Sequence, residues 1–134
     1  MCIRDRGLCN VDLNKLLEFH NKHGKIGTIT TVNIGQAKGI MKVSENGEVT
    51  SFREKADSDG AIINGGFMVF NPELFNYLKD DTTVLEKEPL QELSEAGQLM
   101  GFYHDGFWQC MDTQREKIKL EELWQSDNAP WKIW

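Results

Sequence analysis

Cysteine is scarce in this sequence, and its few residues follow no pattern that builds a disulfide framework or a zinc site. The chain has 134 residues and three cysteines, Cys2, Cys9 and Cys110, without a Cys-x-x-Cys spacing. Disulfide-rich secreted domains and zinc domains instead place cysteines in even numbers or at short, regular intervals. Neither of these classes is therefore indicated.

Long apolar runs and an excess of basic charge are absent as well. No apolar stretch approaches the roughly 20 residues of a membrane-spanning helix, and no segment resembles a signal peptide. The 15 lysines and arginines are outnumbered by 21 aspartates and glutamates, which gives a net charge of −6. Because nucleic-acid binding needs a basic surface, we expect no nucleic-acid partner. Since neither a membrane-spanning run nor a signal peptide is found, we expect no membrane partner and a cytoplasmic location.

Helical and strand patterns alternate along the chain, which predicts an α/β class. A helix is expected between Asp12, its cap, and Gly24, its stop, and the β-branched segment 26–32 is expected to be a strand. Asn46-Gly47 between apolar runs predicts a hairpin, because both turn positions need a positive φ. Strands are also expected at 61–70 and 99–104. Three further helices are expected: one that opens at 71–73 with Asn71 as its cap, one that covers 89–96, and a last one capped by Asp112 or Thr113.

Side chains on three of these helices carry further expectations. His20 and His23 lie three residues apart, and a half-exposed polar pair is favoured over a metal site because no third ligand is apparent nearby. The helix after Pro72 is expected to bury an apolar face that includes Phe75. The last helix is expected to turn four apolar residues inward: Ile118, Leu120, Leu123 and Trp124.

Polar side chains that can meet a ligand lie in three segments, although the common nucleotide-binding and hydrolase motifs are missing. After the hairpin, Lys55 can meet a phosphate and Glu54 can accept sugar hydroxyls, or the two form an exposed ion-pair edge. Asn64 and the bare backbone of Gly65 can meet hydroxyl groups, or the glycines form a β-bulge. Asp112 can hold Mg²⁺, or it caps the helix that follows.

Together, these segments resemble the sugar nucleotidyltransferases. Ser51-Phe-Arg-Glu-Lys55 resembles the family's F-x-E-K-P motif, and Ile63-Asn-Gly-Gly-Phe-Met-Val-Phe70 resembles its I-N-G-G-F-F-V-F motif. Gly106-Phe-Trp-Gln-Cys-Met-Asp-Thr113 and Ala129-Pro-Trp-Lys-Ile-Trp134 are similar to segments of the glucose-1-phosphate cytidylyltransferase branch. The resemblance extends over residues 7–134.

The resemblance implies a partial doubly wound, Rossmann-like sheet, of which this chain would supply the sugar-binding half. It implies that CTP and α-D-glucose 1-phosphate react to CDP-glucose and pyrophosphate, with Mg²⁺ as cofactor and a homo-oligomeric full-length parent. Lys55 would grip the sugar's phosphate and act as the catalytic lysine. Glu54, Asn64 and the Gly65 backbone would contact the sugar. Asp112 would be one ligand of Mg²⁺.

The match also has departures. Residues 1–6 resemble no part of the family, so we expect a foreign or truncated start joined to a sugar-phosphate-binding part at 7–134. The family's glycine-rich nucleotide loop has no counterpart, and Arg6 falls where a second metal-binding aspartate stands in the family. Ala56 replaces a proline and loosens the loop that presents Lys55. We therefore expect the isolated chain to have little or no activity. We also expect it to self-associate or to be poorly soluble, because the absent half would leave one sheet edge and apolar core surface uncovered.

Two alternatives stay open. The parent enzyme could transfer a uridylyl or thymidylyl group, because base specificity lies mainly in the half of the family enzyme that has no counterpart here. The chain could also be a non-catalytic sugar-phosphate-binding or assembly module that pairs with a nucleotide-binding chain. Trp124, Trp131 and Trp134 would then be interface anchors, whereas otherwise they cover the core beside the last helix.

Overall fold

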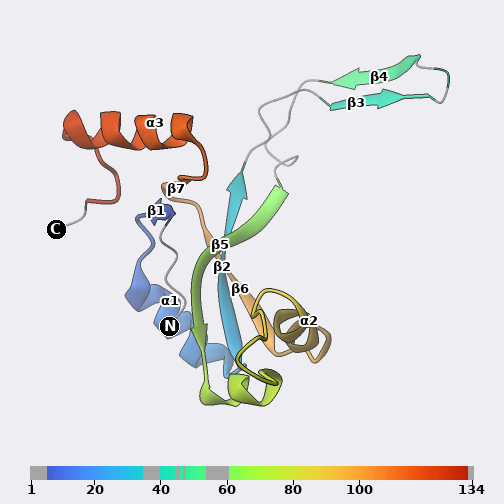
Figure 1. Cartoon of the computed structure of the whole chain (residues 1–134), viewed down its shortest axis with the longest axis vertical. Helices are drawn as coiled ribbons and strands as arrows, with labels where there is room; N and C mark the ends of the chain where they lie inside the picture. Colours follow the sequence, from blue (N-terminus) through green and yellow to red (C-terminus); the bar gives the residue numbers. More distant parts are fainter. Residues whose placement is uncertain (1–5, 35–39, 45, 47, 54–60, 133–134) are drawn as a thin grey trace.

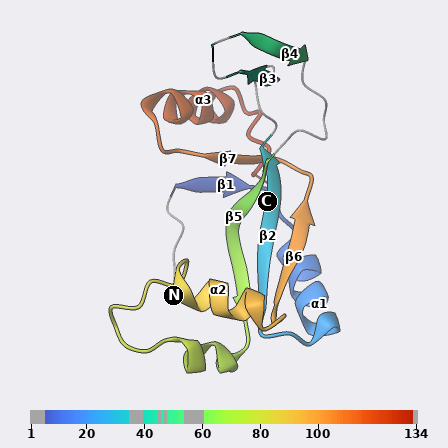
Figure 2. The same cartoon turned by 90° about the vertical axis from the view of Figure 1, so that its right-hand side faces the viewer.

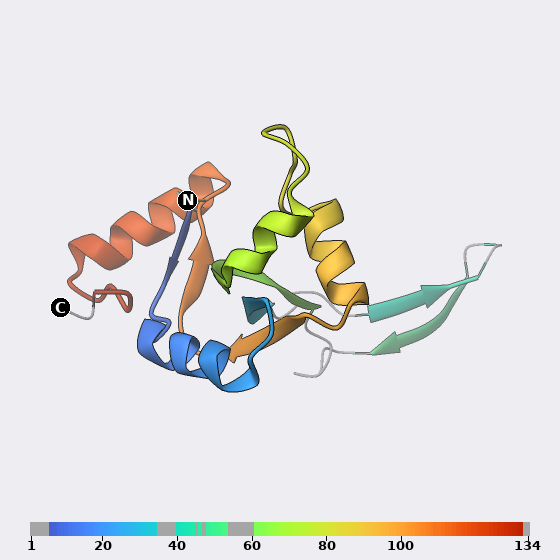
Figure 3. The same ribbon diagram turned by 90° about the horizontal axis from the view of Figure 1, so that it is seen from below.

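A mixed three-stranded sheet forms the centre of the molecule, with helices on both of its faces (Figures 1 and 3). The computed structural model describes residues 6–34, 40–44, 46, 48–53 and 61–132. In chain order the elements are β1 (Gly7–Cys9), α1 (Leu13–His23), β2 (Gly27–Ile34), β3 (Ile40–Val43), β4 (Val49–Arg53), β5 (Ala61–Phe70), the 3₁₀ helix η2 (Pro72–Tyr77), α2 (Glu88–Glu95), β6 (Leu99–His104), β7 (Trp108–Cys110) and α3 (Gln114–Gln125). The predicted α/β class is confirmed.

The central sheet has the order β5-β2-β6, in which β2 pairs antiparallel with β5 and parallel with β6. Because side chains alternate along a strand, Thr28, Thr30 and Val32 of β2 share one face, and all three are buried. Helix α1 covers this face, with Leu16 and His20 buried against it. Helices η2 and α2 lie on the opposite face (Figure 3).

Helix α1 begins and ends where the sequence predicts. The Asp12 carboxylate accepts hydrogen bonds from the backbone N–H groups of Asn14 and Lys15, at 3.0 and 3.1 Å. Gly24 follows the helix with φ = +65°, a left-handed conformation that glycine adopts without a steric penalty. None of the described helices is both long enough and apolar enough to cross a bilayer.

The expected helix after Asn71 is a short 3₁₀ helix, and two expectations about it are wrong. Asn71 makes no side-chain capping bond. Its amide instead donates to the carbonyl oxygen of Lys25 and faces Nε2 of His20. Phe75 is 73% exposed and contributes no buried face. With six residues, η2 is too short to bury a continuous apolar stripe.

The last part of the chain forms a second, smaller core beside the central sheet. Strands β1 and β7 pair antiparallel, and α3 lies beyond β7 (Figure 2). Leu120, Ala129 and Trp131 are buried together, and partly buried Phe107, Met111 and Leu123 pack against them. Trp131 therefore covers the core, as one of the two alternatives expects, whereas Trp134 lies outside the described residues.

Two of the four residues expected to point inward from α3 do not. Ile118 is 45% exposed and Trp124 is 52% exposed. The helix contacts the small core along a narrow line through Leu120 and Leu123, so its other apolar side chains stay at the surface. The Lys132 ammonium lies 5.3 Å from the centre of the Trp124 ring.

Candidate functional site

The predicted phosphate-binding segment follows the β3–β4 hairpin. The two strands pair antiparallel from Ile40 opposite Arg53 onward, which confirms the predicted hairpin. In Figure 1 the hairpin projects away from the central sheet. Glu54 and Lys55 lie outside the described residues, so their assignment to the sugar and to its phosphate stays a prediction.

The two glycines of β5 lie in a β-bulge, which is one of the two alternatives that the sequence leaves open. In the pairing of β2 with β5, Ile29 faces Met68 and Thr31 faces Asn64. The three residues 65–67 therefore lie opposite Thr30 alone, and the ladder shifts there. Gly66 has φ = +98°, and its N–H donates to Oδ1 of Asn64 at 2.8 Å. A bulge of this kind turns backbone groups of residues 65–67 out of the regular ladder, directly beside Asn64.

Gly65 lies at the closest approach within this bulge. A Cβ atom placed on it would lie 3.1 Å from the Thr30 carbonyl oxygen and 3.1 Å from Cγ1 of Val32. Nε1 of Trp108 would lie 3.5 Å from the same Cβ atom, and it donates to the Gly65 carbonyl oxygen at 2.8 Å. The structure thus brings the Asn64–Gly66 segment and the β7 segment together.

Asn64 borders a shallow groove of about 270 Å³ on the central sheet. The other residues that line it are Ile29, Thr31, Ile62, Ile63, Leu99, Met100 and Gly101. While the Asn64 oxygen is engaged by Gly66, its Nδ2 has no acceptor among the described residues. Because a side-chain amide nitrogen carries two N–H donors, Asn64 can donate to the hydroxyl groups of a ligand.

Asp112 does not cap the helix that follows it. Thr113 caps α3, since its hydroxyl oxygen accepts from the N–H of Glu116 at 3.3 Å and the Glu116 carboxylate accepts from the N–H of Thr113 at 2.9 Å. The Asp112 side chain is 61% exposed, and Oδ1 lies 3.7 Å from Nη1 of Arg6. The backbone holds the pair together, because the N–H of Met111 donates to the Arg6 carbonyl oxygen at 2.7 Å.

The described residues do not by themselves form a complete magnesium site. Mg²⁺ takes several oxygen ligands in near-octahedral geometry. Over the described ranges, no three His, Cys, Asp or Glu side chains gather where a metal could bind. The positive guanidinium of Arg6 also lies beside the Asp112 carboxylate. The role of Asp112 as a Mg²⁺ ligand stays a prediction, and position 6 lies beside it as the resemblance implies.

The histidine pair of α1 is structural, and His20 is not half-exposed as expected but 3% exposed. Thr28 lies between the two rings, with its hydroxyl 2.8 Å from Nδ1 of His20 and 2.7 Å from Nε2 of His23. Nε2 of His20 lies 3.1 Å from the Asn71 side-chain oxygen, and Nδ1 of His23 accepts from the N–H of Lys25. All four ring nitrogens therefore have partners within the protein.

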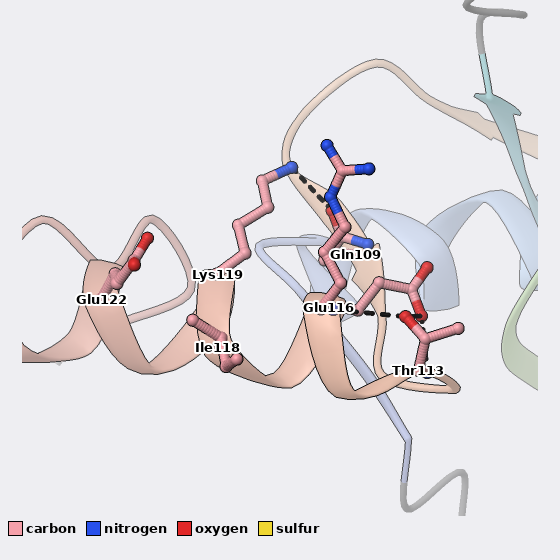
Figure 4. Close-up of a pocket in the computed structure, with 7 residues that line it drawn as sticks. Gln109, Thr113, Glu116, Ile118, Lys119 and Glu122 are labelled. Atoms are coloured by element: carbon pink, nitrogen blue, oxygen red, sulfur yellow. Dashed lines mark hydrogen bonds between the residues drawn. The ribbon is translucent and has the colours of Figure 1, made fainter.

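A second groove, of about 640 Å³, runs along α3 (Figure 4). It is lined by Gln109, Thr113, Arg115, Glu116, Ile118, Lys119 and Glu122. Nζ of Lys119 donates to the Gln109 side-chain oxygen at 2.8 Å, and the Glu116 carboxylate points back toward Thr113 (Figure 4). Sequence reasoning missed this groove, because nothing in the sequence places β7 beside α3.

The fold defines a mixed α/β protein in which the bulged strand β5 contacts β7 through the bond between Gly65 and Trp108. Asp112 follows β7 just before α3 begins. The chain belongs to the nucleotidyl transferase family, because the model of that family matches residues 3–114.

Two bacterial relatives extend this comparison. Proteins named glucose-1-phosphate cytidylyltransferase from Salmonella typhi and Salmonella typhimurium are each 44% identical to this chain over 128 residues. The matched region covers 96% of this chain and 49% of each relative, so the chain spans about half the length of these relatives. The crystal structure of HddC from Yersinia pseudotuberculosis has the same fold, with a TM-score of 0.62 and 18% identity over 89% of this chain and 52% of that chain.

Proposed function

We propose that this chain is the sugar-phosphate-binding part of a transferase that makes CDP-glucose and pyrophosphate from CTP and α-D-glucose 1-phosphate. The relatives named glucose-1-phosphate cytidylyltransferase support this reaction, since they match almost the whole chain at 44% identity. The full-length parent is proposed to be a cytoplasmic homo-oligomer. Because this chain spans about half of those relatives, the CTP site is assigned to the other half.

The observation that carries the proposal is the contact between Trp108 and the bulge at Gly65. Asn64 and Gly65 lie on β5, whereas Asp112 follows β7 by two residues. The hydrogen bond from Trp108 to Gly65 links these two elements. This bond supports a site that includes both the proposed sugar contacts and the carboxylate, although they are far apart in the sequence.

In the proposed reaction, a phosphate oxygen of the sugar attacks the α-phosphorus of CTP in line, and pyrophosphate leaves. Both reactants are negatively charged, so catalysis depends on holding them together and on offsetting their charge. Lys55 supplies positive charge to the sugar's phosphate. Glu54 accepts hydrogen bonds from sugar hydroxyls, Asn64 donates to them, and the Gly65 backbone forms part of the surface beneath the sugar.

Calorimetric titration with glucose 1-phosphate tests the proposal on the chain as it is. We expect the wild type to bind and Lys55→Ala to bind about tenfold more weakly or worse, because a charge-assisted hydrogen bond to phosphate is lost. Lys79→Ala is the matched control, since Lys79 is exposed and pairs with Glu92 at 3.9 Å. Equal weakening in both variants contradicts the role of Lys55, and no binding by the wild type overturns the site.

Activity assays show whether the isolated chain is only one part of a transferase or is active on its own. We expect the isolated chain to release little or no pyrophosphate from CTP and glucose 1-phosphate, because no CTP site is assigned to it. A purified chain with substantial turnover would contradict that expectation. A chain that binds glucose 1-phosphate but gains no activity with any nucleotide-binding half would instead favour a non-catalytic sugar-phosphate module.

A further inference from the structure

The carboxylate of Glu116 accepts hydrogen bonds from the end of β7 and from the residues that lead into α3. Oε2 of Glu116 accepts from the N–H of Thr113 at 2.9 Å, the hydroxyl of Thr113 at 3.0 Å and the N–H of Asp112 at 3.0 Å. Oε1 accepts from the Cys110 thiol at 3.1 Å. The donors span four residues, from the last residue of β7 to the cap of α3.

This arrangement exceeds what a helix cap requires. A capping box needs the exchange between the Thr113 side chain and the Glu116 N–H, and between the Glu116 side chain and the Thr113 N–H. The bonds from Asp112 and Cys110 lie outside this exchange, because both residues precede the helix cap. They instead fix the backbone on which the Asp112 side chain stands.

The Asp112 side chain benefits from this support in a specific way. Its backbone N–H is held by Glu116, while its exposed carboxylate lies toward Arg6 and outside the cap. A side chain with two rotatable bonds is oriented mainly by its backbone, so a fixed N–H limits where the carboxylate can lie. Loss of the Glu116 bonds would leave this carboxylate on a loose junction.

We propose that Glu116 is a positioning residue for Asp112, acting through its hydrogen bonds to the Asp112 and Cys110 donors. The proposal rests on the proposed function only in that this function places Asp112 in the site. Glu116 itself touches neither the sugar nor the nucleotide in that assignment. The positioning role of Glu116 is inferred from hydrogen bonds within the chain, so this role can be tested without any ligand.

Amide hydrogen exchange and the carboxyl-carbon NMR signal of Asp112 provide the test. In Glu116→Ala we expect the Asp112 N–H to exchange about tenfold faster or more, because a hydrogen bond to a charged acceptor is lost. The Asp112 carboxyl signal should shift as well. Glu122→Gln is the matched control, since Glu122 lies on the same helix and groove, and it should leave both signals unchanged.

Thr113→Val distinguishes positioning from a purely structural role. This variant removes the capping hydroxyl, together with the bond that it donates to Oε2 of Glu116. It leaves in place the N–H donors of Thr113 and Asp112 to that carboxylate. Helix signals of α3 should weaken while the Asp112 amide stays protected. If Thr113→Val and Glu116→Ala move the Asp112 signals equally, or if Glu116→Ala leaves them unchanged, the proposal is overturned.

Cys110→Ala keeps the proposal testable should Glu116→Ala fail to fold. It removes the thiol that donates to Glu116, and the Asp112 N–H should exchange faster than in the wild type, by a smaller factor than in Glu116→Ala. The carboxyl signal is no readout in this variant, because the thiol also interacts directly with the Asp112 side chain. An unchanged exchange rate of the Asp112 N–H, beside an unfolded Glu116→Ala, overturns the proposal. Glucose 1-phosphate is titrated into the wild type separately, so that absent sugar-phosphate binding is distinguished from absent positioning.

Discussion

The indole nitrogen of Trp108 donates a 2.8 Å hydrogen bond to the carbonyl oxygen of Gly65, 43 residues earlier in the chain. Strand β7 carries the donor, and the bulge of β5 carries the acceptor. The ladder leaves this carbonyl without a regular partner on its bulged side, so the tryptophan satisfies a backbone group that would otherwise be costly to bury. The bond therefore couples the small C-terminal core to the central sheet.

Replacing Trp108 by phenylalanine tests the energy of this contact. We expect the free energy of unfolding to fall by about 1–3 kcal/mol, because a buried carbonyl loses its donor while most of the ring is kept. Urea unfolding followed by far-UV circular dichroism measures the change. Trp124→Phe, at a ring that is 52% exposed, is the matched control and should stay within about 0.5 kcal/mol.

A methyl group at Gly65 tests how tightly the bulge is packed. Gly65→Ala places Cβ 3.1 Å from the Thr30 carbonyl oxygen, a backbone atom that the sheet holds in place. We expect a loss of about 1–3 kcal/mol in the free energy of unfolding, as for other overpacked sites. Gly7→Ala, where no atom lies within 4 Å of the added group, should change it little. Equal urea midpoints for the two variants would contradict the close approach.

Local rules predicted most of the elements of this fold. The capped helix α1 and the hairpin β3–β4 each follow from residues that are neighbours in the sequence, and the structure confirms both. The glycine bulge, one of two alternatives for its segment, is present as well. The failures are tertiary. Asn71 is a good cap residue by type, but its side-chain oxygen lies against Nε2 of His20 and its nitrogen donates to the Lys25 carbonyl, so it makes no capping bond. Both partners are distant in the sequence, so no local pattern could indicate these contacts.

The residues of the candidate site could be proposed from the sequence, but their arrangement could not. The resemblance in several motifs pointed to Asn64, Gly65 and Asp112, but the spacing of these residues could not show that Trp108 of β7 donates a hydrogen bond to Gly65. Nor could it choose between Asp112 and its neighbour as the cap of α3. That choice depends on backbone geometry, since Thr113 has the extended conformation of a cap and places its hydroxyl over the first turn.

The identity of this cap can be tested in stability measurements. Thr113→Ala removes the side-chain oxygen that accepts from the Glu116 N–H, so we expect a loss of about 1 kcal/mol in the free energy of unfolding. Asp112→Asn should change it by less than about 0.5 kcal/mol, because its ion pair with Arg6 is exposed. Urea midpoints in the reverse order would show that Asp112 is the cap after all.

The histidine network predicts a dependence of stability on pH. Partial burial, together with the neighbouring His20 and Lys25, lowers the pKa of His23 below its ordinary value of 6.5. As the pH falls below about 6.5, the unfolded chain therefore binds a proton at His23 before the folded chain does, and the folded state loses stability. Above about pH 6.5 both states are neutral there, and this contribution is fully present.

Urea unfolding of the wild type and of His23→Gln between pH 5 and pH 8 measures this effect. The free energy of unfolding should rise with pH in the wild type and then level off near neutrality. The rise should be smaller in His23→Gln, since the variant has no proton to bind at this position. This range lies above the ordinary pKa values of the carboxyl groups, so their titration contributes little to the slope. A steeper rise in the variant than in the wild type would show that His23 is charged in the folded chain, with its Nδ1 no longer accepting from the Lys25 N–H.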